Sequence, residues 1–171
     1  NTTIDASGQA EPGKALCRWG DAGWGTLVRT SKYRGDRFGD ELVEACAVMV
    51  EEWSPEPPPT WVTAIPSLSR PELVPDFAKR LADVLDLPFR PALTKISARP
   101  PRKQMNNSAQ QARNVDGSLE VSAAAMRPGP VLLVDDIVDS RWTMTIAAWL
   151  LRRARSGPVY PLALALAGSD E

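Results

Sequence analysis

The stretch VLLVDDIVDSRWTMT, from Val131 to Thr145, decides the fold. Its four leading apolar residues predict a buried strand, and two adjacent acids, Asp135 and Asp136, follow them. A short polar turn then leads into a helix predicted from Trp142 to Arg155. A strand that passes through an acidic turn into a helix is typical of parallel α/β sheets, in which ligands bind beyond the carboxyl ends of the strands.

Two further helices are predicted from helical spacing of apolar residues. One runs from Asp40 to Trp53, with Asp36 or Asp40 as its N-cap, and its stripe includes Cys46. The other runs from about Pro71 to Leu85, and its proline at position 75 is tolerated if it lies in the first turn.

Apolar and β-branched runs predict the strands, at Trp61 to Ile65, Phe89 to Leu93, Val131 to Val134 and Val159 to Ala167. The segment from Ala15 to Val28 is interpreted as a short strand and turn that pack on the main body. The resulting order of strands and helices predicts an α/β fold with a parallel sheet and right-handed crossovers.

Composition predicts one soluble domain. The chain has 171 residues, of which 43% are hydrophobic and 24% charged. Residues 1–14 are polar and resemble an interdomain linker, so the domain is predicted at 15–171. The sequence contains neither a membrane span nor a signal peptide, which favours a cytoplasmic location. Cys17 and Cys46 are too few and too far apart for a disulfide framework, and we expect buried free thiols.

Charge and residue usage exclude several chemistries. The chain has no histidine, which removes Ser-His-Asp triads and Cys-His dyads. Its formal net charge of -1 gives no overall basic excess for nucleic acid. A polar excursion from Lys95 to Val115, however, carries five basic residues and no acid, so a local contact with DNA stays open.

The acidic turn has the groups that a ribose 5-phosphate needs. Ser140 and Thr143 provide hydroxyls, and the start of the following helix offers unpaired amides and a positive dipole end for a phosphate. Asp135 and Asp136 are suited to accept hydrogen bonds from two vicinal hydroxyls.

This stretch resembles the phosphoribosyl pyrophosphate motif of type I phosphoribosyltransferases: four apolar residues, two acids, two apolar residues and a phosphate turn. Lys32 to Gly35, Gln104, Arg113 to Val115 and Gly117 resemble the ComF branch of that superfamily. The run from Ala15 to Ala167, with WGDAGWG and PSLSRPELVPDFAKRLA, looks closest to the phosphoribosyltransferase-like domain at the C-terminal end of some bacterial RecQ-type ATP-dependent DNA helicases.

The resemblance implies a type I phosphoribosyltransferase-like parallel sheet flanked by helices, with a small hood formed by the loop excursion. Asp139 takes the place of an acid/base aspartate near the nucleobase. Magnesium would come only with bound phosphoribosyl pyrophosphate, held mainly by the ligand's oxygens, and no metal site of the protein's own is expected. The ribose and phosphate contacts implied are Asp135, Asp136, Ser140, Arg141, Trp142 and Thr143, and the pyrophosphate and hood contacts are Ser67, Ser69, Arg70, Lys95, Arg102, Lys103, Gln104 and Arg113.

Arg141 departs from the resemblance, because it stands where the family's phosphate loop has a glycine. A side chain there either impairs the site or rebuilds it, with the guanidinium binding the phosphate. Trp142, Ile146 and Trp149 share helical spacing and are predicted to belong to the core.

Three functions stay open. In the first, the chain is an accessory domain of a RecQ-type helicase that keeps the phosphoribosyltransferase frame, and Arg141 leaves open whether its ribose phosphate site is degenerate. The motor would lie elsewhere on the parent chain, since no GxxxxGK[ST] loop occurs here. Alternatively it is an active, Mg-dependent phosphoribosyltransferase or a phosphoribosyl pyrophosphate sensor. The third possibility is a DNA-binding module that uses Lys95 to Arg113.

Overall fold

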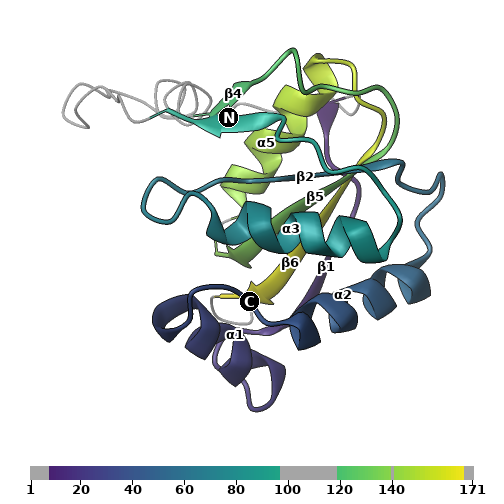
Figure 1. The fold of residues 1–171 in the computed structure, drawn as a ribbon. Coiled ribbons are helices and arrows are strands. Elements are labelled where there is room, and N and C mark those ends of the chain that lie inside the picture. The colour runs from purple at the N-terminus through teal and green to yellow at the C-terminus, as the bar shows by residue number, and fades with distance from the viewer. Residues whose placement is uncertain (1–7, 97–118, 140, 168–171) are drawn as a thin grey trace.

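A four-stranded parallel sheet forms the centre of the molecule (Figure 1). The structure is a computed structural model that describes residues 8–96, 119–139 and 141–167. The sheet has the order β1-β6-β5-β2, and every neighbouring pair is parallel. This confirms the predicted α/β class. The strands are β1 (Lys14–Arg18), β2 (Trp61–Ala64), β5 (Val131–Val138) and β6 (Val159–Leu166).

Helices cover both faces of the sheet (Figure 1). On one face lie α1 (Trp24–Arg34), α2 (Asp40–Trp53) and α3 (Leu73–Val84). On the other lie α5 (Trp142–Arg153) and a two-stranded antiparallel sheet of β3 and β4. The bounds of these two strands are Leu93–Lys95 and Leu119–Val121. The predicted bounds of α2 are confirmed, and those of α3 and α5 are each confirmed to within two residues.

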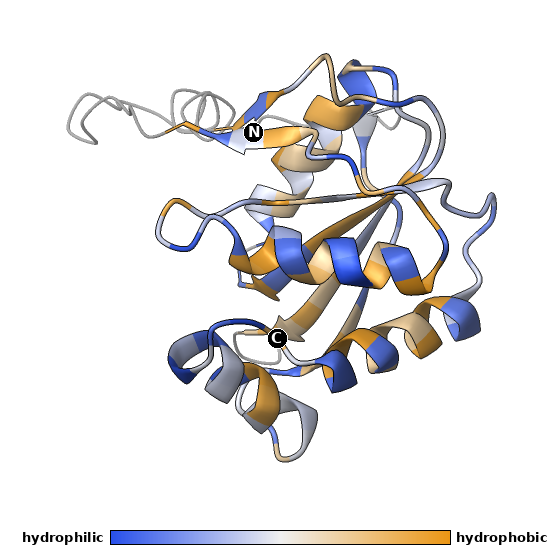
Figure 2. Cartoon of the chain, viewed as in Figure 1, coloured by the Kyte–Doolittle hydropathy of each residue, from blue (hydrophilic) through white to orange (hydrophobic). Residues whose placement is uncertain are grey.

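Alternation along β5 divides the core into two layers. Leu132 and Val134 pack with α2 and α3, whereas Val131 and Leu133 pack with α5 and β3. All four side chains are fully buried. Figure 2 shows the same division on α2 and α3, whose hydrophobic residues face the sheet and whose hydrophilic residues face solvent. The continuous apolar run predicted a strand buried on both faces, and the structure confirms it.

The N-terminal region contains a helix that the sequence reading missed. Ala15 to Val28 was predicted as a strand and turn, but the chain forms β1, turns at Gly20 and Gly23, and enters α1 at Trp24. Both glycines have positive φ, at 82° and 77°. Because α1 buries only Gly25 and Val28, it lacks the apolar stripe by which helices are recognised in sequence.

Two other predictions need correction. The strand predicted from Phe89 to Leu93 is a single bridge between Val62 and Phe89, because the chain has prolines at positions 88 and 91 and Leu93 already belongs to β3. The N-cap of α2 is Gly39, which makes no side-chain capping bond, rather than Asp36 or Asp40.

The strand that carries the acidic pair is longer than predicted. It was expected to end at Val134, but β5 continues to Val138, because Asp135, Ile137 and Val138 all pair with β6. Asp135 and Asp136 therefore lie in the second half of β5, and not in a loop.

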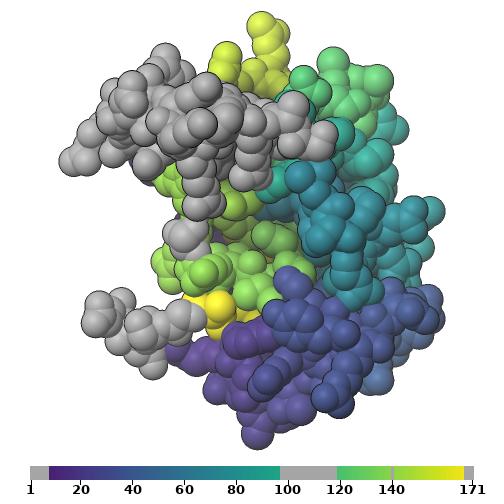
Figure 3. Space-filling model, turned by 90° about the vertical axis from the view of Figure 1, so that its left-hand side faces the viewer, coloured from purple at the N-terminus to yellow at the C-terminus, as the bar shows by residue number. Residues whose placement is uncertain are grey.

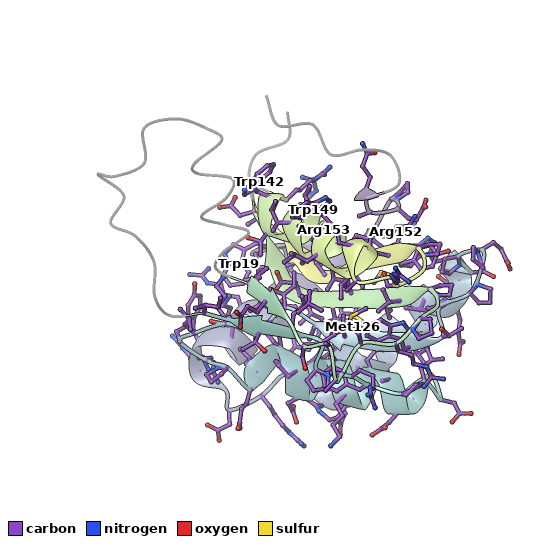
Figure 4. All side chains as sticks on the ribbon, turned by 90° about the horizontal axis from the view of Figure 1, so that it is seen from above. Trp19, Met126, Trp142, Trp149, Arg152 and Arg153 are labelled. Atoms are coloured by element: carbon purple, nitrogen blue, oxygen red, sulfur yellow. The ribbon has the colours of Figure 1, made fainter. Side chains whose placement is uncertain are left out.

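The tryptophans of α5 are not core residues. Ile146 is buried as predicted, whereas Trp142 and Trp149 are only half-buried. Figure 4 shows Trp142, Trp149 and Arg153 along α5, and the Arg153 guanidinium lies 4.5 Å from the centre of the Trp149 ring. This cation-π contact accommodates a tryptophan that the core does not enclose. Within the described ranges, no helix is long and apolar enough to cross a bilayer.

Candidate functional site

A small polar pocket of about 120 Å³ lies between the end of β5 and the start of α5. It brings together four of the residues predicted for a ribose phosphate site. On the face shown in Figure 3, the green atoms of β5 and α5 lie in a hollow beside the purple atoms of α1. The residues that line the pocket are Asp135, Ile137, Val138, Asp139, Arg141, Thr143 and Met144.

Arg141 has a glycine-like backbone. Its φ and ψ are 64° and -8°, in the left-handed region, and it is the N-cap of α5. The chain at this position therefore lies in a dihedral region that glycine favours. The arginine side chain is exposed and lines the pocket, so its guanidinium adds a positive charge where a phosphate is expected.

The acidic pair is held by the backbone of β5. The Asp136 amide donates to Asp135 Oδ1 over 2.8 Å, and the Ile137 amide donates to Asp136 Oδ1 over 2.7 Å. Burial raises the pKa of Asp135 well above its ordinary value, and the adjacent Asp136 raises it further. The pair offers carboxyl oxygens as hydrogen-bond acceptors at the end of β5.

Lys32 forms an ion pair with the acidic pair that the sequence analysis did not predict. Its Nζ lies 2.8 Å from Asp136 Oδ2, although the two residues are more than a hundred positions apart. The only sequence signal was that Lys32 begins the KYRG stretch of the family resemblance, which assigned it no role. The pairing depends on α1, the helix that the sequence did not predict.

The loop after β2 lies next to the acidic pair. Ile65 donates its amide to the Val134 carbonyl, so the chain that leaves β2 passes beside Asp135. The hydroxyls of Ser67 and Ser69 lie 3.0 Å apart in this loop. These two predicted pyrophosphate contacts are not among the residues that line the pocket, and their hydroxyls bond to each other.

Arg70, predicted to border pyrophosphate, contacts the end of α1. Its guanidinium donates to the carbonyls of Lys32, Gly35 and Asp36, the last two over 2.9 Å and 3.4 Å. These bonds satisfy carbonyls that the helix leaves unpaired at its C-terminal end. In this structure Arg70 links the loop after β2 to α1, and a contact with a ligand stays a prediction.

The remaining predicted contacts divide into two groups. Lys95 ends β3, and Trp142 begins α5 in a half-buried position. The others lie outside the described residues, namely Ser140, Arg102, Lys103, Gln104 and Arg113.

A second, larger hollow of about 280 Å³ adjoins the pocket, and it lies between residues 10–15, β6 and the start of α5. Val138, Arg141 and Met144 line both spaces. Ala15, Pro161 and Ala163 add small or apolar surface to it. Arg141 thus lies at the boundary between a polar and a more apolar space.

In the part of the chain that the structure describes, no group of three or more His, Cys, Asp or Glu side chains could hold a metal ion. Asp135 and Asp136 carry oxygens of the kind that magnesium prefers, but two residues are fewer than such a group requires.

Comparison with solved structures gives the fold. An adenine phosphoribosyltransferase is similar at a TM-score of 0.50 and 21% identity, over 73% of this chain and 69% of that one. The allosteric regulatory enzyme of purine biosynthesis is similar at a TM-score of 0.49 and 18% identity, over 71% of this chain. Glutamine phosphoribosylpyrophosphate amidotransferase from B. subtilis, complexed with ADP and GMP, gives 0.48 and 21%, also over 71% of this chain. This chain spans 25% of each of the latter two proteins.

The chain therefore has the fold of the type I phosphoribosyltransferases, with a parallel four-stranded sheet flanked by helices. No protein-family model matches the sequence, and no curated protein matches it. At these identities the likeness shows the fold alone.

Proposed function

We propose that the chain binds a ribose 5-phosphate group, as in phosphoribosyl pyrophosphate, at the end of β5. The observation that carries this proposal is the pocket in which Asp135, Asp139, Arg141 and Thr143 meet at the start of α5. The carboxyl group of Asp135 would accept hydrogen bonds from the ribose hydroxyls. The Thr143 hydroxyl, the Arg141 guanidinium and the amides at the start of α5 would donate hydrogen bonds to the phosphate.

The conformation of Arg141 supports a site rebuilt around arginine over a lost one. Its left-handed φ of 64° preserves a glycine-type turn, so the loop need not take another path. Its side chain lines the pocket and matches a phosphate as a charged fork. A degenerate site remains the alternative if the guanidinium occupies the space that the phosphate needs.

Reaction chemistry would follow from the same geometry. If the chain is an active phosphoribosyltransferase, displacement at the anomeric carbon is helped by positioning and charge stabilisation, with Asp139 as the acid/base group near the acceptor. Magnesium would enter with phosphoribosyl pyrophosphate and neutralise its charge. A sensor that binds the same ligand without turnover uses the same contacts.

Calorimetry tests the binding proposal. Ribose 5-phosphate, and phosphoribosyl pyrophosphate with magnesium, are titrated into the wild type and into a double variant, Asp135→Asn with Asp136→Asn. We expect saturable binding that the double variant weakens by more than about tenfold, since two carboxyl groups that accept hydrogen bonds are lost. Asp83→Asn, which removes an exposed carboxylate on α3, is the matched control. No heat at millimolar ligand overturns the proposal.

We propose as the biological setting an accessory domain of a RecQ-type DNA helicase in the cytoplasm. Support comes from the sequence resemblance, which includes WGDAGWG at the turn between β1 and α1 and PSLSRPELVPDFAKRLA from the end of β2 into α3. The helicase motor of the parent chain would be the partner. The encoding gene is then expected to specify a GxxxxGK[ST] loop, and a gene without one contradicts the assignment.

DNA contact through Lys95 to Arg113 is the weaker functional proposal, because most of this range lies outside the described residues. It predicts binding to single strands or forks that falls steeply with salt. Binding that is absent or independent of salt removes it.

A further inference from the structure

The outer side of α1 combines exposed aromatic and basic side chains. Tyr33 is 70% exposed and Trp24 is 41% exposed. Arg29 and Tyr33 are four residues apart, so they lie on one side of the helix, a turn from each other. Figure 1 shows α1 at an edge of the molecule, beside the carboxyl end of β6. We call the surface formed by these three residues and the exposed Arg34 and Arg37 the α1 surface.

Packing against the sheet does not explain the aromatic side chains of this surface. Helix α1 buries only Gly25 and Val28, so its contact with the core needs neither Trp24 nor Tyr33. Within the described ranges two aromatic side chains are exposed, and both belong to α1. A single exposed aromatic residue needs no explanation, but two beside several arginines mark a surface for a partner.

The Tyr33 ring is held in place although most of it faces solvent. It meets the Trp19 ring edge to face, with ring centroids 5.8 Å apart and an angle of 81° between the planes. The Trp19 amide donates to the Leu166 carbonyl over 2.8 Å, which fixes Trp19 at the end of β6. A ring that is already restricted loses little conformational freedom when a flat partner stacks on it.

The C-terminal end of α1 is also fixed. The Arg70 guanidinium donates to the carbonyls of Lys32 and Gly35. These bonds hold the backbone on both sides of Tyr33 and Arg34. Both side chains are therefore presented from a fixed position and not from a loose helix end.

Positive charge is concentrated around α1. Residues 18–37 include five basic and two acidic residues, whereas the rest of the chain has 15 basic and 19 acidic residues. Lys32 pairs with Asp136, but none of the described ion pairs includes an arginine of the α1 surface. This surface therefore attracts anions although the chain as a whole carries a formal net charge of -1.

We infer that the α1 surface binds single-stranded nucleic acid. Unpaired bases offer flat faces on which Tyr33 and Trp24 stack, and the phosphates of the strand match the arginines. A duplex hides those faces and an acidic peptide such as polyglutamate lacks them, so neither uses the aromatic part of the surface. This inference depends neither on the ribose 5-phosphate pocket nor on the range Lys95 to Arg113.

Fluorescence anisotropy of a short labelled oligothymidine tests the inference. If three arginines each contact a phosphate, the logarithm of the association constant falls with the logarithm of the salt concentration with a slope of about -2. Tyr33→Ala weakens binding by about 5-fold to 100-fold and leaves this slope unchanged, because it removes stacking and no charge. Tyr33→Phe keeps the ring and binds like the wild type.

Replacement of the arginines gives the converse result. Arg29→Gln with Arg34→Gln makes the slope shallower by about 1.4, because two phosphate contacts are lost. Arg155→Gln is the matched control, since it removes one positive charge at an exposed position after α5, on the opposite face of the sheet. It leaves the affinity and the slope unchanged. If Tyr33→Ala does not fold, an unchanged slope in the arginine variant overturns the inference.

Three other results overturn it as well. The first is the absence of binding to the oligonucleotide at about 50 mM salt. The second is binding of polyglutamate as tight as that of the oligonucleotide, together with an unaffected Tyr33→Ala, since the surface then recognises charge alone. The third is loss of binding when Arg102 and Lys103 are replaced by glutamine, while the α1 variants bind like the wild type. That result assigns the nucleic acid to the range Lys95 to Arg113. None of these outcomes affects the ribose 5-phosphate proposal, which calorimetry tests separately.

Discussion

Thr145 donates both its backbone N–H and its hydroxyl to the backbone carbonyl of Arg141, over 3.0 Å and 2.9 Å. These two bonds begin α5 at a residue whose φ is positive. They hold the turn before α5 in a conformation that costs a side-chain-bearing residue about 1–2 kcal/mol. The turn is thus maintained against the preference of its own residue.

Replacing Arg141 by glycine is expected to relieve this cost. Arg141→Gly should exceed Arg141→Ala in free energy of unfolding by about 1 kcal/mol, because both remove the guanidinium but only glycine favours the left-handed region. Urea denaturation of the two variants measures the difference. An alanine variant as stable as the glycine variant contradicts the argument.

The fold was predictable from the sequence wherever burial imposed a pattern. The apolar run VLLV at Val131 to Val134 and the apolar stripe of α2 both consist of residues that are buried in the structure. Helix α1 has no such apolar pattern, since it buries only Gly25 and Val28. The prediction of a strand from Phe89 was wrong for another reason, because the neighbouring prolines limit the pairing to a single bridge with Val62.

The grouping of the candidate site residues in one place was predictable where they are close in sequence. Asp135, Asp139, Arg141 and Thr143 were identified as one group, and one pocket contains them. Lys32 was not placed, because its pairing with Asp136 depends on how α1 packs and no local pattern encodes that. The left-handed φ of Arg141 could not be predicted either, since an arginine in the sequence does not indicate a glycine-type turn.

Asp135 is expected to make stability depend on pH. Its pKa is raised in the folded protein by burial and by Asp136, so its contribution is fully present below the unfolded pKa of about 3.9 and is lost as pH rises through the folded pKa. Asp135→Asn removes the ionisable group and keeps an acceptor for the Asp136 amide. The variant should therefore gain stability over the wild type as pH rises from acid to neutral.

Urea denaturation across that pH range measures the effect. Asp139→Asn, at an exposed position in the same pocket, is the control for loss of one negative charge. If the advantage of Asp135→Asn over wild type does not grow with pH, the raised pKa is contradicted.

Arg80 is expected to be a stabilising link between α2 and α3. Its guanidinium donates to Asp76 and Asp40, over 2.8 Å and 2.9 Å, and also to the Phe38 carbonyl. Arg80→Met should lower the free energy of unfolding by about 2 kcal/mol, because it leaves a carbonyl and two carboxylates without their donor. Thermal and urea denaturation measure this.

Two further variants separate the contributions. Asp40 is 73% exposed, so Asp40→Asn should cost less than about 0.5 kcal/mol. Arg29→Met, at an exposed position on α1, controls for loss of one positive charge. A loss in Arg80→Met no larger than that in Arg29→Met shows that the link does not contribute.

Cys46 is expected to be unreactive in the folded protein. It lies fully buried on α2, and burial raises the pKa of its thiol to about 12. At mildly alkaline pH, three units above the ordinary value of 9.0 reduce the reactive thiolate about a thousandfold. Cys17→Ser leaves Cys46 as the only thiol, because the chain has two cysteines. An aromatic disulfide reagent should modify this variant rapidly in denaturant and at least a hundredfold more slowly when it is folded.

Cys46→Ser is the reciprocal variant, in which the half-buried Cys17 donates to the Leu164 carbonyl over 3.2 Å and should react at an intermediate rate. Equal rates for Cys46 in the folded and unfolded chain contradict its place in the core.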